Sequence, residues 1–184
     1  RKATLAGREG EDLWVFAYGS LMWDADFPYA ETRPAHLWGY HRTLCLYSFD
    51  YRGTRKVPGL VLGLDRGGSC RGMAFRIEAK DREAAMAHLM ARETAKGEYH
   101  LRWLTLFVEG SPAPITGAAF VVNHANEHYA GPQSADAAAR LVAQGRGRRG
   151  PCADYLRNTV THLQEMGIRD RALERVLKKV EPGA

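Results

Sequence analysis

The order of strand-like and helix-like segments constrains the fold of this chain more than any other feature. Apolar and β-branched runs typical of strands come first, one helical segment interrupts them, and further helical segments end the chain. The expected strands are residues 13–18, 38–49, 59–64, 71–78, 99–108 and 115–122. This order predicts an α+β fold, in which a small curved antiparallel sheet or β-barrel carries peripheral helices.

The helical segments carry recognisable start signals. The inserted helix is expected to begin after Asp81 and to continue through "REAAMAHLMARE", which is rich in helix formers. The C-terminal helices are expected at residues 134–144, 151–167 and 169–180, with Ser134, Pro151 and Asp170 near their starts. No linker divides the chain, so residues 12–184 are expected to form a single domain after a flexible N-terminal segment, residues 1–11.

Composition indicates a soluble globular protein. Of the 184 residues, 45% are hydrophobic and 26% are charged, which is ordinary for such a domain. No apolar run approaches the roughly 18–20 residues that span a bilayer, and the first residues lack the apolar core of a signal peptide. We therefore expect a cytoplasmic protein without a membrane partner.

The cysteines and the positive charge suggest no special partner. Three widely spaced cysteines, Cys45, Cys70 and Cys152, form no C-x-x-C pair and are expected to be buried or partly buried thiols in a reducing compartment. The net charge of +5 is spread along the chain except for the basic cluster at residues 146–149. No aromatic and basic motif accompanies that cluster, so we expect no nucleic-acid partner.

Glu93 lies on the face of the inserted helix that should be buried. At about 100° per residue it falls within about 60° of Met86, Leu89 and Met90, which form the apolar stripe. Burial raises the pKa of a carboxyl group toward the range in which it acts as a base near neutral pH. Periodicity leaves two alternatives open, namely that Glu93 reaches solvent at a fraying helix end or that it pairs with an arginine.

Other catalytic motifs are missing from the sequence. There is no G-x-S-x-G elbow, no P-loop and no G-x-G-x-x-G after a strand. The segment "HANEH", from His124 to His128, fits the H-x-x-E-H zinc motif, which requires a helix. Because it follows a strand and precedes Gly131 and Pro132, we interpret it as a polar loop and expect no metal site.

The stretch "WVFAYGSLMWD" interrupts strand-like residues with a turn at Tyr18, Gly19 and Ser20. A turn at the end of a strand leaves backbone N–H groups unpaired, and a glycine lets a ligand approach that backbone closely. Such donors suit an anionic or carbonyl oxygen. The alternative is an ordinary turn whose amides meet water.

Three motifs occur in order along the chain: "FAYGSLMW", "RETAKGEY", and "YAGP" followed by "GPCADYL". Together they resemble the ChaC family of γ-glutamylcyclotransferases over roughly residues 14–156. The resemblance implies a γ-glutamylcyclotransferase-like fold, a small β-barrel with peripheral helices. One departure is Lys96-Gly97, where the family pattern has a pair of glycines.

The resemblance also implies an activity and a site. A glutathione-specific γ-glutamylcyclotransferase releases 5-oxoproline and Cys-Gly when the glutamyl α-amine attacks its own γ-carbonyl, without a metal or cofactor. Glu93 is the implied general acid and base. The implied substrate-binding residues are Val15, Phe16, Ala17, Tyr18, Gly19, Ser20, Leu21 and Tyr155. The alternatives are other γ-glutamyl peptides or amines as substrates, or a non-catalytic γ-glutamyl-binding regulator of cation transport.

Overall fold

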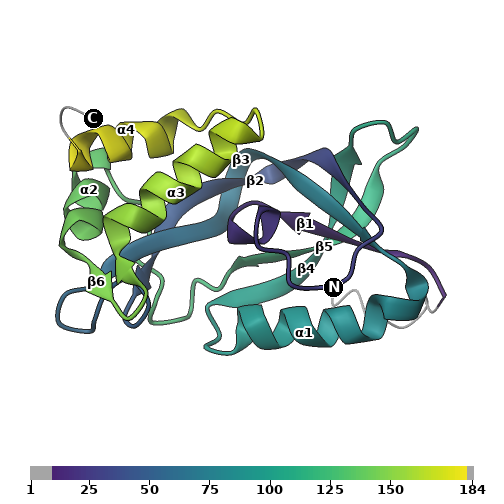
Figure 1. The fold of residues 1–184 in the computed structure, drawn as a ribbon, viewed down its shortest axis with the longest axis horizontal. Coiled ribbons are helices and arrows are strands. Elements are labelled where there is room, and N and C mark those ends of the chain that lie inside the picture. Colours follow the sequence, from purple (N-terminus) through teal and green to yellow (C-terminus); the bar gives the residue numbers. More distant parts are fainter. Residues whose placement is uncertain (1–9, 182–184) are drawn as a thin grey trace. The chain divides into compact units, whose positions relative to one another are not determined.

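A computed structural model of the chain describes residues 10–181 (Figure 1). Residues 1–9 of the expected N-terminal segment therefore lie outside the described residues. The described chain forms two compact units, which we consider separately. Unit 1 consists of residues 10–42 and 64–123, and unit 2 consists of residues 43–63 and 124–181.

Unit 1 contains a closed barrel with the strand order β1-β3-β2-β4-β5. The strands are β1 (Leu13–Ala17), β2 (Glu31–Ser48), β3 (Gly59–Ile77), β4 (Tyr99–Val108) and β5 (Ile115–Val122). The far end of β2 and the near end of β3 belong to unit 2. The predicted barrel is confirmed, but its strands are mixed, because β1 pairs antiparallel with β3 and parallel with β5.

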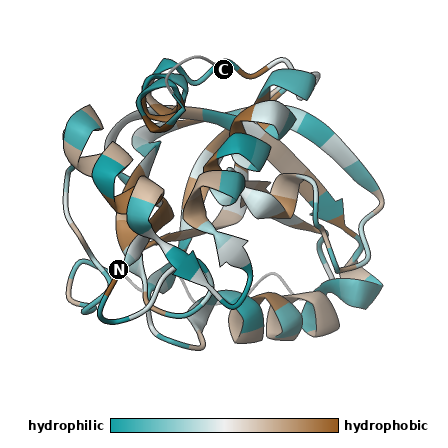
Figure 2. Ribbon diagram, turned by 60° about the vertical axis from the view of Figure 1, so that its left-hand side comes forward, coloured by the Kyte–Doolittle hydropathy of each residue, from teal (hydrophilic) through white to brown (hydrophobic). Residues whose placement is uncertain are grey.

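The barrel core is built from apolar side chains of every strand. Those less than 2% exposed include Phe16, Leu37, Leu64, Leu106 and Phe120. Figure 2 shows the hydrophobic colouring concentrated on the strands, whereas the helices alternate between hydrophobic and hydrophilic residues. Packing is tight where β4 meets β5, because a Cβ added to Gly117 would lie 2.4 Å from the Leu106 Cδ1 atom. A larger residue at that position would displace the Leu106 side chain, and its Cβ would lie 3.1 Å from the Trp14 carbonyl oxygen.

The inserted helix α1 (Arg82–Thr94) follows the short 3₁₀ helix η2 (Ala79–Asp81) and packs against β4. Its start at Asp81 was predicted, although the Asp81 side chain makes no capping hydrogen bond. The buried stripe is Arg82, Ala85, Met86 and Leu89, while Met90, which we expected in the stripe, is half-buried. The helix thus rests on the barrel through the face that the sequence predicted.

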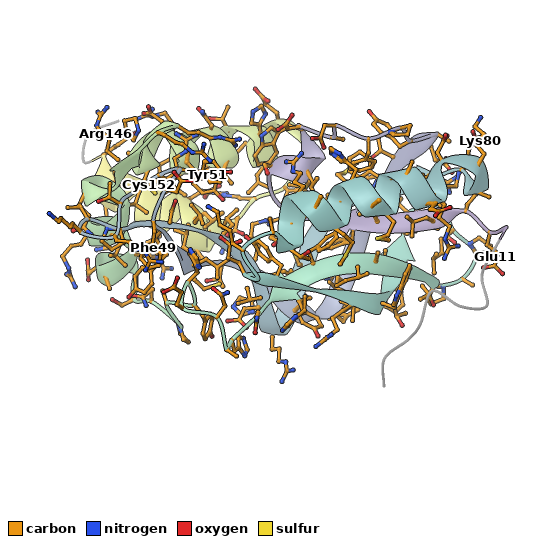
Figure 3. All side chains as sticks on the ribbon, turned by 90° about the horizontal axis from the view of Figure 1, so that it is seen from below. Glu11, Phe49, Tyr51, Lys80, Arg146 and Cys152 are labelled. Atoms are coloured by element: carbon orange, nitrogen blue, oxygen red, sulfur yellow. The ribbon has the colours of Figure 1, made fainter. Side chains whose placement is uncertain are left out.

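Unit 2 contains three helices that pack on one another: α2 (Ala135–Gln144), α3 (Cys152–Glu165) and α4 (Arg171–Val180). The expected caps are present at Ser134, which accepts from the Ala137 N–H, and at Asp170, which accepts from the Leu173 N–H. The short strands β6 (Arg146–Gly147) and β7 (Gly150–Pro151) form a hairpin before α3. Figure 3 labels Arg146 in β6 and Cys152 at the start of α3. All three cysteines are free and buried, as predicted.

Two strands are longer than the sequence indicated. Residues 59–64 and 71–78 were predicted as separate strands, but β3 is continuous from Gly59 to Ile77. Gly67 and Gly68 adopt φ values of 98° and 64°, so the glycines bend the strand without ending it. β2 begins at Glu31 rather than at Trp38, and the carbonyl of Pro34 within it accepts from the Glu109 N–H at 2.9 Å. Among residues 10–181, no helix is long and apolar enough to cross a membrane.

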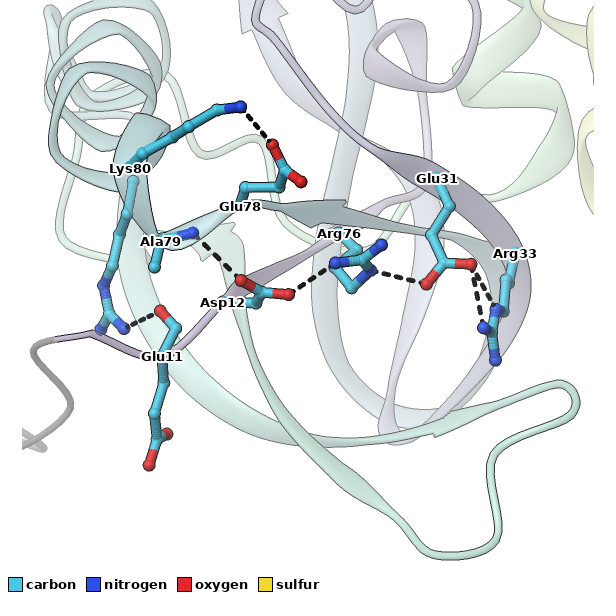
Figure 4. A network of polar contacts seen from close by, with 9 residues as sticks. Glu11, Asp12, Glu31, Arg33, Arg76, Glu78, Ala79 and Lys80 are labelled. Carbon is cyan, nitrogen blue, oxygen red and sulfur yellow. Dashed lines mark hydrogen bonds and ion pairs between the residues drawn. The ribbon is translucent and has the colours of Figure 1, made fainter.

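A polar network joins the start of β1 to β2 and β3 on unit 1 (Figure 4). The Arg76 guanidinium contacts Asp12 Oδ2 and Glu31 Oε1, each at 2.6 Å. The second Glu31 oxygen accepts from the Arg33 Nε and Nη2 atoms, and Asp12 Oδ1 accepts from the Ala79 N–H. Hydrogen bonds from Arg76 hold the pKa of both the Asp12 and the Glu31 carboxyl groups below their ordinary values.

We predict that Arg76→Met lowers the thermal unfolding midpoint more near pH 7 than near pH 3. Because the pKa values of Asp12 and Glu31 are lowered by folding, the stabilisation is present above the ordinary carboxyl range and is lost as the pH falls below it. Circular dichroism melts across this pH range test the prediction. Arg102→Met is the control, since the exposed Arg102 side chain contacts the Leu101 carbonyl oxygen. A difference that stays constant with pH would contradict the prediction.

Candidate functional site

The turn at Gly19 presents backbone donors at the end of β1. The 3₁₀ helix η1 (Ser20–Met22) begins two residues after the strand, and the Met22 N–H donates to the Gly19 carbonyl at 2.9 Å. Within residues 10–181, the N–H groups of Gly19, Ser20 and Leu21 have no hydrogen-bond acceptor. Gly19 has φ −137°, so a left-handed backbone is not the reason for glycine there. The turn therefore offers three adjacent N–H donors.

Arg42 fixes the orientation of this turn, and the sequence analysis did not identify it. Its side chain is only 7% exposed, its Nε donates to the Tyr18 carbonyl oxygen, and its Nη2 donates to the Arg71 carbonyl oxygen at 2.7 Å. In a trans peptide the C=O and N–H bonds point in opposite directions. The Arg42 contact therefore directs the Gly19 N–H away from the guanidinium.

A signal for Arg42 exists in the sequence. Along β2, Arg42 shares the period-two spacing of Leu44 and Leu46, which are 4% and 1% exposed. A charged residue in register with apolar ones indicates a buried charge, which proteins keep only where it is paired or hydrogen-bonded. The same pattern drew attention to Glu93 on the helix.

Glu93 lies in the last turn of α1, and its side chain is 16% exposed. Burial raises the pKa of the Glu93 carboxyl group, and the negative charges of Glu98 and Asp26 raise it further. The adjacent Arg92 lowers it, and its Nε lies 3.2 Å from Glu93 Oε1. Burial and a contact with arginine, which the sequence offered as alternatives for Glu93, therefore both occur. Their net effect is to raise the pKa of Glu93.

Arg92 brings Glu93 and the turn together. Besides Glu93, its guanidinium contacts the Ser20 Oγ atom at 3.4 Å and Asp26 Oδ1 at 2.7 Å. Ser20 belongs to η1, and Asp26 lies in the segment that follows η1. The Arg92 side chain therefore links the end of α1 to the donor turn, although the two lie about 70 residues apart in the sequence.

The other residues predicted to bind substrate lie on and after β1. Val15, Phe16, Ala17, Tyr18 and Leu21 are buried, Gly19 is half-buried and Ser20 is exposed. The side chains of Val15, Phe16 and Ala17 are thus part of the barrel core, and the polar groups of this stretch are the main chain and the hydroxyls of Tyr18 and Ser20. Their role in binding a substrate stays a prediction.

Tyr155 belongs to unit 2, where it lies on α3. The Leu62 N–H donates to its hydroxyl oxygen at 3.1 Å, and the Arg52 guanidinium lies 5.8 Å from the centre of its ring. Burial raises the pKa of the Tyr155 hydroxyl. These contacts explain its position in unit 2, and its role in a substrate pocket stays a prediction.

The "HANEH" segment is a series of turns and not a helix. The His124 ring stacks on Tyr129 at 4.4 Å between centroids, and His128 Nδ1 lies 2.8 Å from Asn126 Oδ1. The two histidines therefore lack the helical spacing that the zinc motif requires. In the described part of the chain, no group of three His, Cys, Asp or Glu side chains is arranged to hold a metal ion.

Comparison with known proteins gives the family. The family model described as ChaC-like protein matches residues 13–182. The chain belongs to the ChaC-like family. Two relatives named glutathione-specific γ-glutamylcyclotransferase, from Mus musculus and Escherichia coli K12, are each 32% identical to it. These matches cover 91% and 97% of this chain, and 78% of each relative.

A solved structure shows the same fold. A crystal structure of a yeast γ-glutamyl cyclotransferase specific to glutathione matches with a TM-score of 0.83 and 21% identity. The match covers 94% of this chain and 96% of that chain. At the Lys96-Gly97 departure from the expected motif, Gly97 has a positive φ of 74° and lies three residues after the end of α1.

We predict that Glu93→Gln raises the thermal unfolding midpoint near pH 8 and leaves it close to wild type near pH 4. The raised pKa of Glu93 means that the folded state gives up its proton less readily than the unfolded state, where the pKa is about 4.3. The free energy of unfolding of the wild type therefore falls as the pH rises from the pKa of Glu93 in the unfolded state to its pKa in the folded state. The glutamine amide does not titrate, so the variant does not lose this stability.

Calorimetry at both pH values measures the effect, with about 2–4 °C expected for each kcal/mol relieved. Glu83→Gln is a matched control, because Glu83 is exposed in the first turn of the same helix. A lower midpoint for Glu93→Gln near pH 8 would show that the buried carboxylate stabilises the fold.

Proposed function

We propose that this chain is a glutathione-specific γ-glutamylcyclotransferase, which converts glutathione to 5-oxoproline and Cys-Gly. The observation that carries the proposal is a largely buried carboxylate, Glu93, joined through Arg92 to a turn with three open N–H donors. The names of the mouse and Escherichia coli relatives support glutathione as the substrate. The family match spans parts of both units, which supports residues 12–184 acting as one domain.

The reaction closes a ring within the substrate. The α-amine nitrogen of the glutamyl group forms a bond to the γ-carbonyl carbon, and the amide bond from that carbon to the cysteine nitrogen breaks. Because nucleophile and electrophile belong to one molecule, the enzyme gains a proximity advantage by holding the chain in a bent conformation. A protein nucleophile is not needed for this step.

Glu93 acts as the proton carrier in this proposal. The α-ammonium group has an ordinary pKa of about 8 and must lose a proton before it attacks. Glu93 accepts that proton and returns it to the cysteine nitrogen as the amide bond breaks, which regenerates the carboxylate. The attacking nitrogen loses a second proton as it becomes the lactam N–H, and that proton passes to the released amine, which leaves as an ammonium group. Burial, which raises the pKa of Glu93, makes it a stronger base than an exposed glutamate.

The donor turn holds substrate oxygens. The N–H groups of Gly19, Ser20 and Leu21 suit a carboxylate or the oxygen of the γ-carbonyl, whose negative charge grows during the attack. Arg42 keeps the Gly19 N–H directed toward such an oxygen because it holds the carbonyl of the same peptide unit. Main-chain donors fixed in this way need no reorganisation during the reaction.

We predict that Glu93→Gln loses about 10²-fold or more in turnover of glutathione while the protein stays folded and still binds glutathione. Purified wild type and variant are incubated with glutathione, and 5-oxoproline and Cys-Gly are measured by mass spectrometry. Glu83→Gln is the matched control and should keep wild-type activity. If Glu93→Gln keeps more than about a tenth of the wild-type rate, Glu93 is not the base, and Glu98 is the next candidate.

We also predict that glutathione acetylated on its glutamyl nitrogen is not cleaved. Acetylation delocalises the lone pair of the attacking nitrogen into an amide and makes it a poor nucleophile, whereas a hydrolase that uses water would not require a free α-amine. The same assay measures Cys-Gly from the blocked and the free compound, with γ-glutamyl amines as further substrates to define specificity. Release of free glutamate instead of 5-oxoproline would contradict the cyclisation. Binding of glutathione without any product would favour a regulatory protein.

A further inference from the structure

The Arg92 guanidinium contacts three carboxylates, those of Glu93, Asp26 and, at 3.7 Å from its Nη2 atom, Asp24. Its Nε faces Glu93 Oε1 at 3.2 Å, and its Nη1 donates to Asp26 Oδ1 at 2.7 Å. The Nη1 atom also donates to the Asp24 carbonyl oxygen at 3.0 Å, and Nη2 reaches Ser20 Oγ at 3.4 Å. The contact to Asp26 is the shorter one, so Arg92 interacts more strongly with Asp26 than with Glu93.

Asp26 is itself held on both of its oxygens. Its second oxygen, Oδ2, lies 2.9 Å from the His88 Nε2 atom, and His88 precedes Arg92 by one turn of α1. Partial burial raises the pKa of Asp26, but hydrogen bonds from His88 and Arg92 outweigh it and hold the pKa below its ordinary value. Asp26 is therefore ionised near neutral pH and competes with Glu93 for the guanidinium.

A full ion pair between Arg92 and Glu93 would work against a base. An arginine in bidentate contact with a carboxylate stabilises the ionised form and weakens its affinity for a proton. In this structure the two Nη atoms of Arg92 are engaged by Asp26, Asp24 and Ser20, and Nε is the atom that faces Glu93. Arg92 can thus orient Glu93 without taking over both of its oxygens.

We propose that Asp26 and Arg92 form a positioning pair for Glu93, in which Asp26 draws the guanidinium away so that Arg92 orients the carboxylate and Ser20 without neutralising the base. This inference rests on the proposed function. Neither residue takes part in bond making. Arg92 sets the position of the carboxylate relative to the donor turn, and Asp26 sets how much positive charge Glu93 experiences.

The charged groups that face Glu93 give the pair a distinctive signature. Arg92 on the same helix lowers the pKa of Glu93, whereas Asp26 from the segment after η1 and Glu98 from the segment before β4 raise it. Removing Arg92 should therefore raise the pKa of Glu93, and removing the charge of Asp26 should lower it. If the two residues had a purely structural role, the two replacements would not shift the pKa of Glu93 in opposite directions.

The experiment compares wild type with Asp26→Asn, Arg92→Gln and Arg92→Lys. The acid limb of kcat/KM against pH is expected to move to lower pH in Asp26→Asn and to higher pH in Arg92→Gln. Turnover in Arg92→Gln should fall about 10- to 100-fold, because the carboxylate is no longer held in place. Arg92→Lys keeps the charge but cannot reach Ser20, Asp26 and Glu93 together, so its acid limb stays nearer to wild type while kcat falls.

Arg33→Gln is the matched control, because Arg33 makes a comparable two-bond contact with Glu31 on β2 of the same unit. It should change neither the pH profile nor kcat. Thermal unfolding of each variant shows whether it is folded, and Asp26 and Arg92 are 45% and 22% exposed, so their replacement leaves no large cavity. Full activity in Arg92→Lys, or acid limbs that move in the same direction in Asp26→Asn and Arg92→Gln, would overturn the proposal.

A second readout separates the failure of this inference from failure of the proposed function. The ¹³C chemical shift of the Glu93 carboxyl carbon is followed against pH in each variant without substrate. Opposite displacements of this titration in Asp26→Asn and Arg92→Gln support the positioning pair even if glutathione is not turned over. An unmoved titration in both variants overturns it, even if glutathione proves to be the substrate.

Discussion

The candidate site depends on the closure of the barrel through β1. This strand pairs with β3 on one side and with β5 on the other, and its side chains at Leu13, Val15, Phe16 and Ala17 are almost fully buried. A strand fixed on both edges ends at a defined point. The N–H groups of Gly19, Ser20 and Leu21 lie beyond this end of the strand, so the whole barrel sets the place of the donors of the turn.

The candidate site also requires a carboxylate that is largely removed from solvent but can still accept a proton. Burial of Glu93 on the stripe of α1 costs stability, and its proposed role as a base gives a reason for keeping it. The arginine beside it limits this cost without cancelling it, because Arg92 also contacts Asp26 and Ser20. The Arg92 guanidinium, which lies between the end of α1 and the segment after η1, therefore affects both the stability of the fold and the basicity of Glu93.

Much of the fold could be predicted from local patterns. The strands β4 and β5 were predicted to the residue, since apolar alternation is strong there and the connection "EGSPAPITG" is rich in turn residues. β3 was divided in error, because a glycine pair usually signals a turn, and here Gly67 and Gly68 bend a strand that continues. The parallel pairing of β1 with β5 was not predicted, since it joins segments about 100 residues apart.

The site was predicted in part. Glu93 was visible because a carboxylate on an apolar stripe contradicts the pattern around it, and only 16% of the side chain is exposed. The partners of Arg92 were not visible, because Asp24, Asp26 and Ser20 reach it through tertiary structure. Arg42 carried the same kind of local contradiction on β2, but strand alternation in a segment so rich in apolar residues is harder to recognise than a helical stripe.

The hold of Arg42 on the Tyr18 carbonyl has a consequence for how sequences of this kind can vary. The donors of the turn are main-chain atoms, so every residue type except proline supplies them. The direction of the donor peptide is therefore encoded on a different strand and not by the side chains of the turn. Selection that preserves the geometry of the turn therefore also acts on Arg42, a buried residue that lies 24 residues further along the chain.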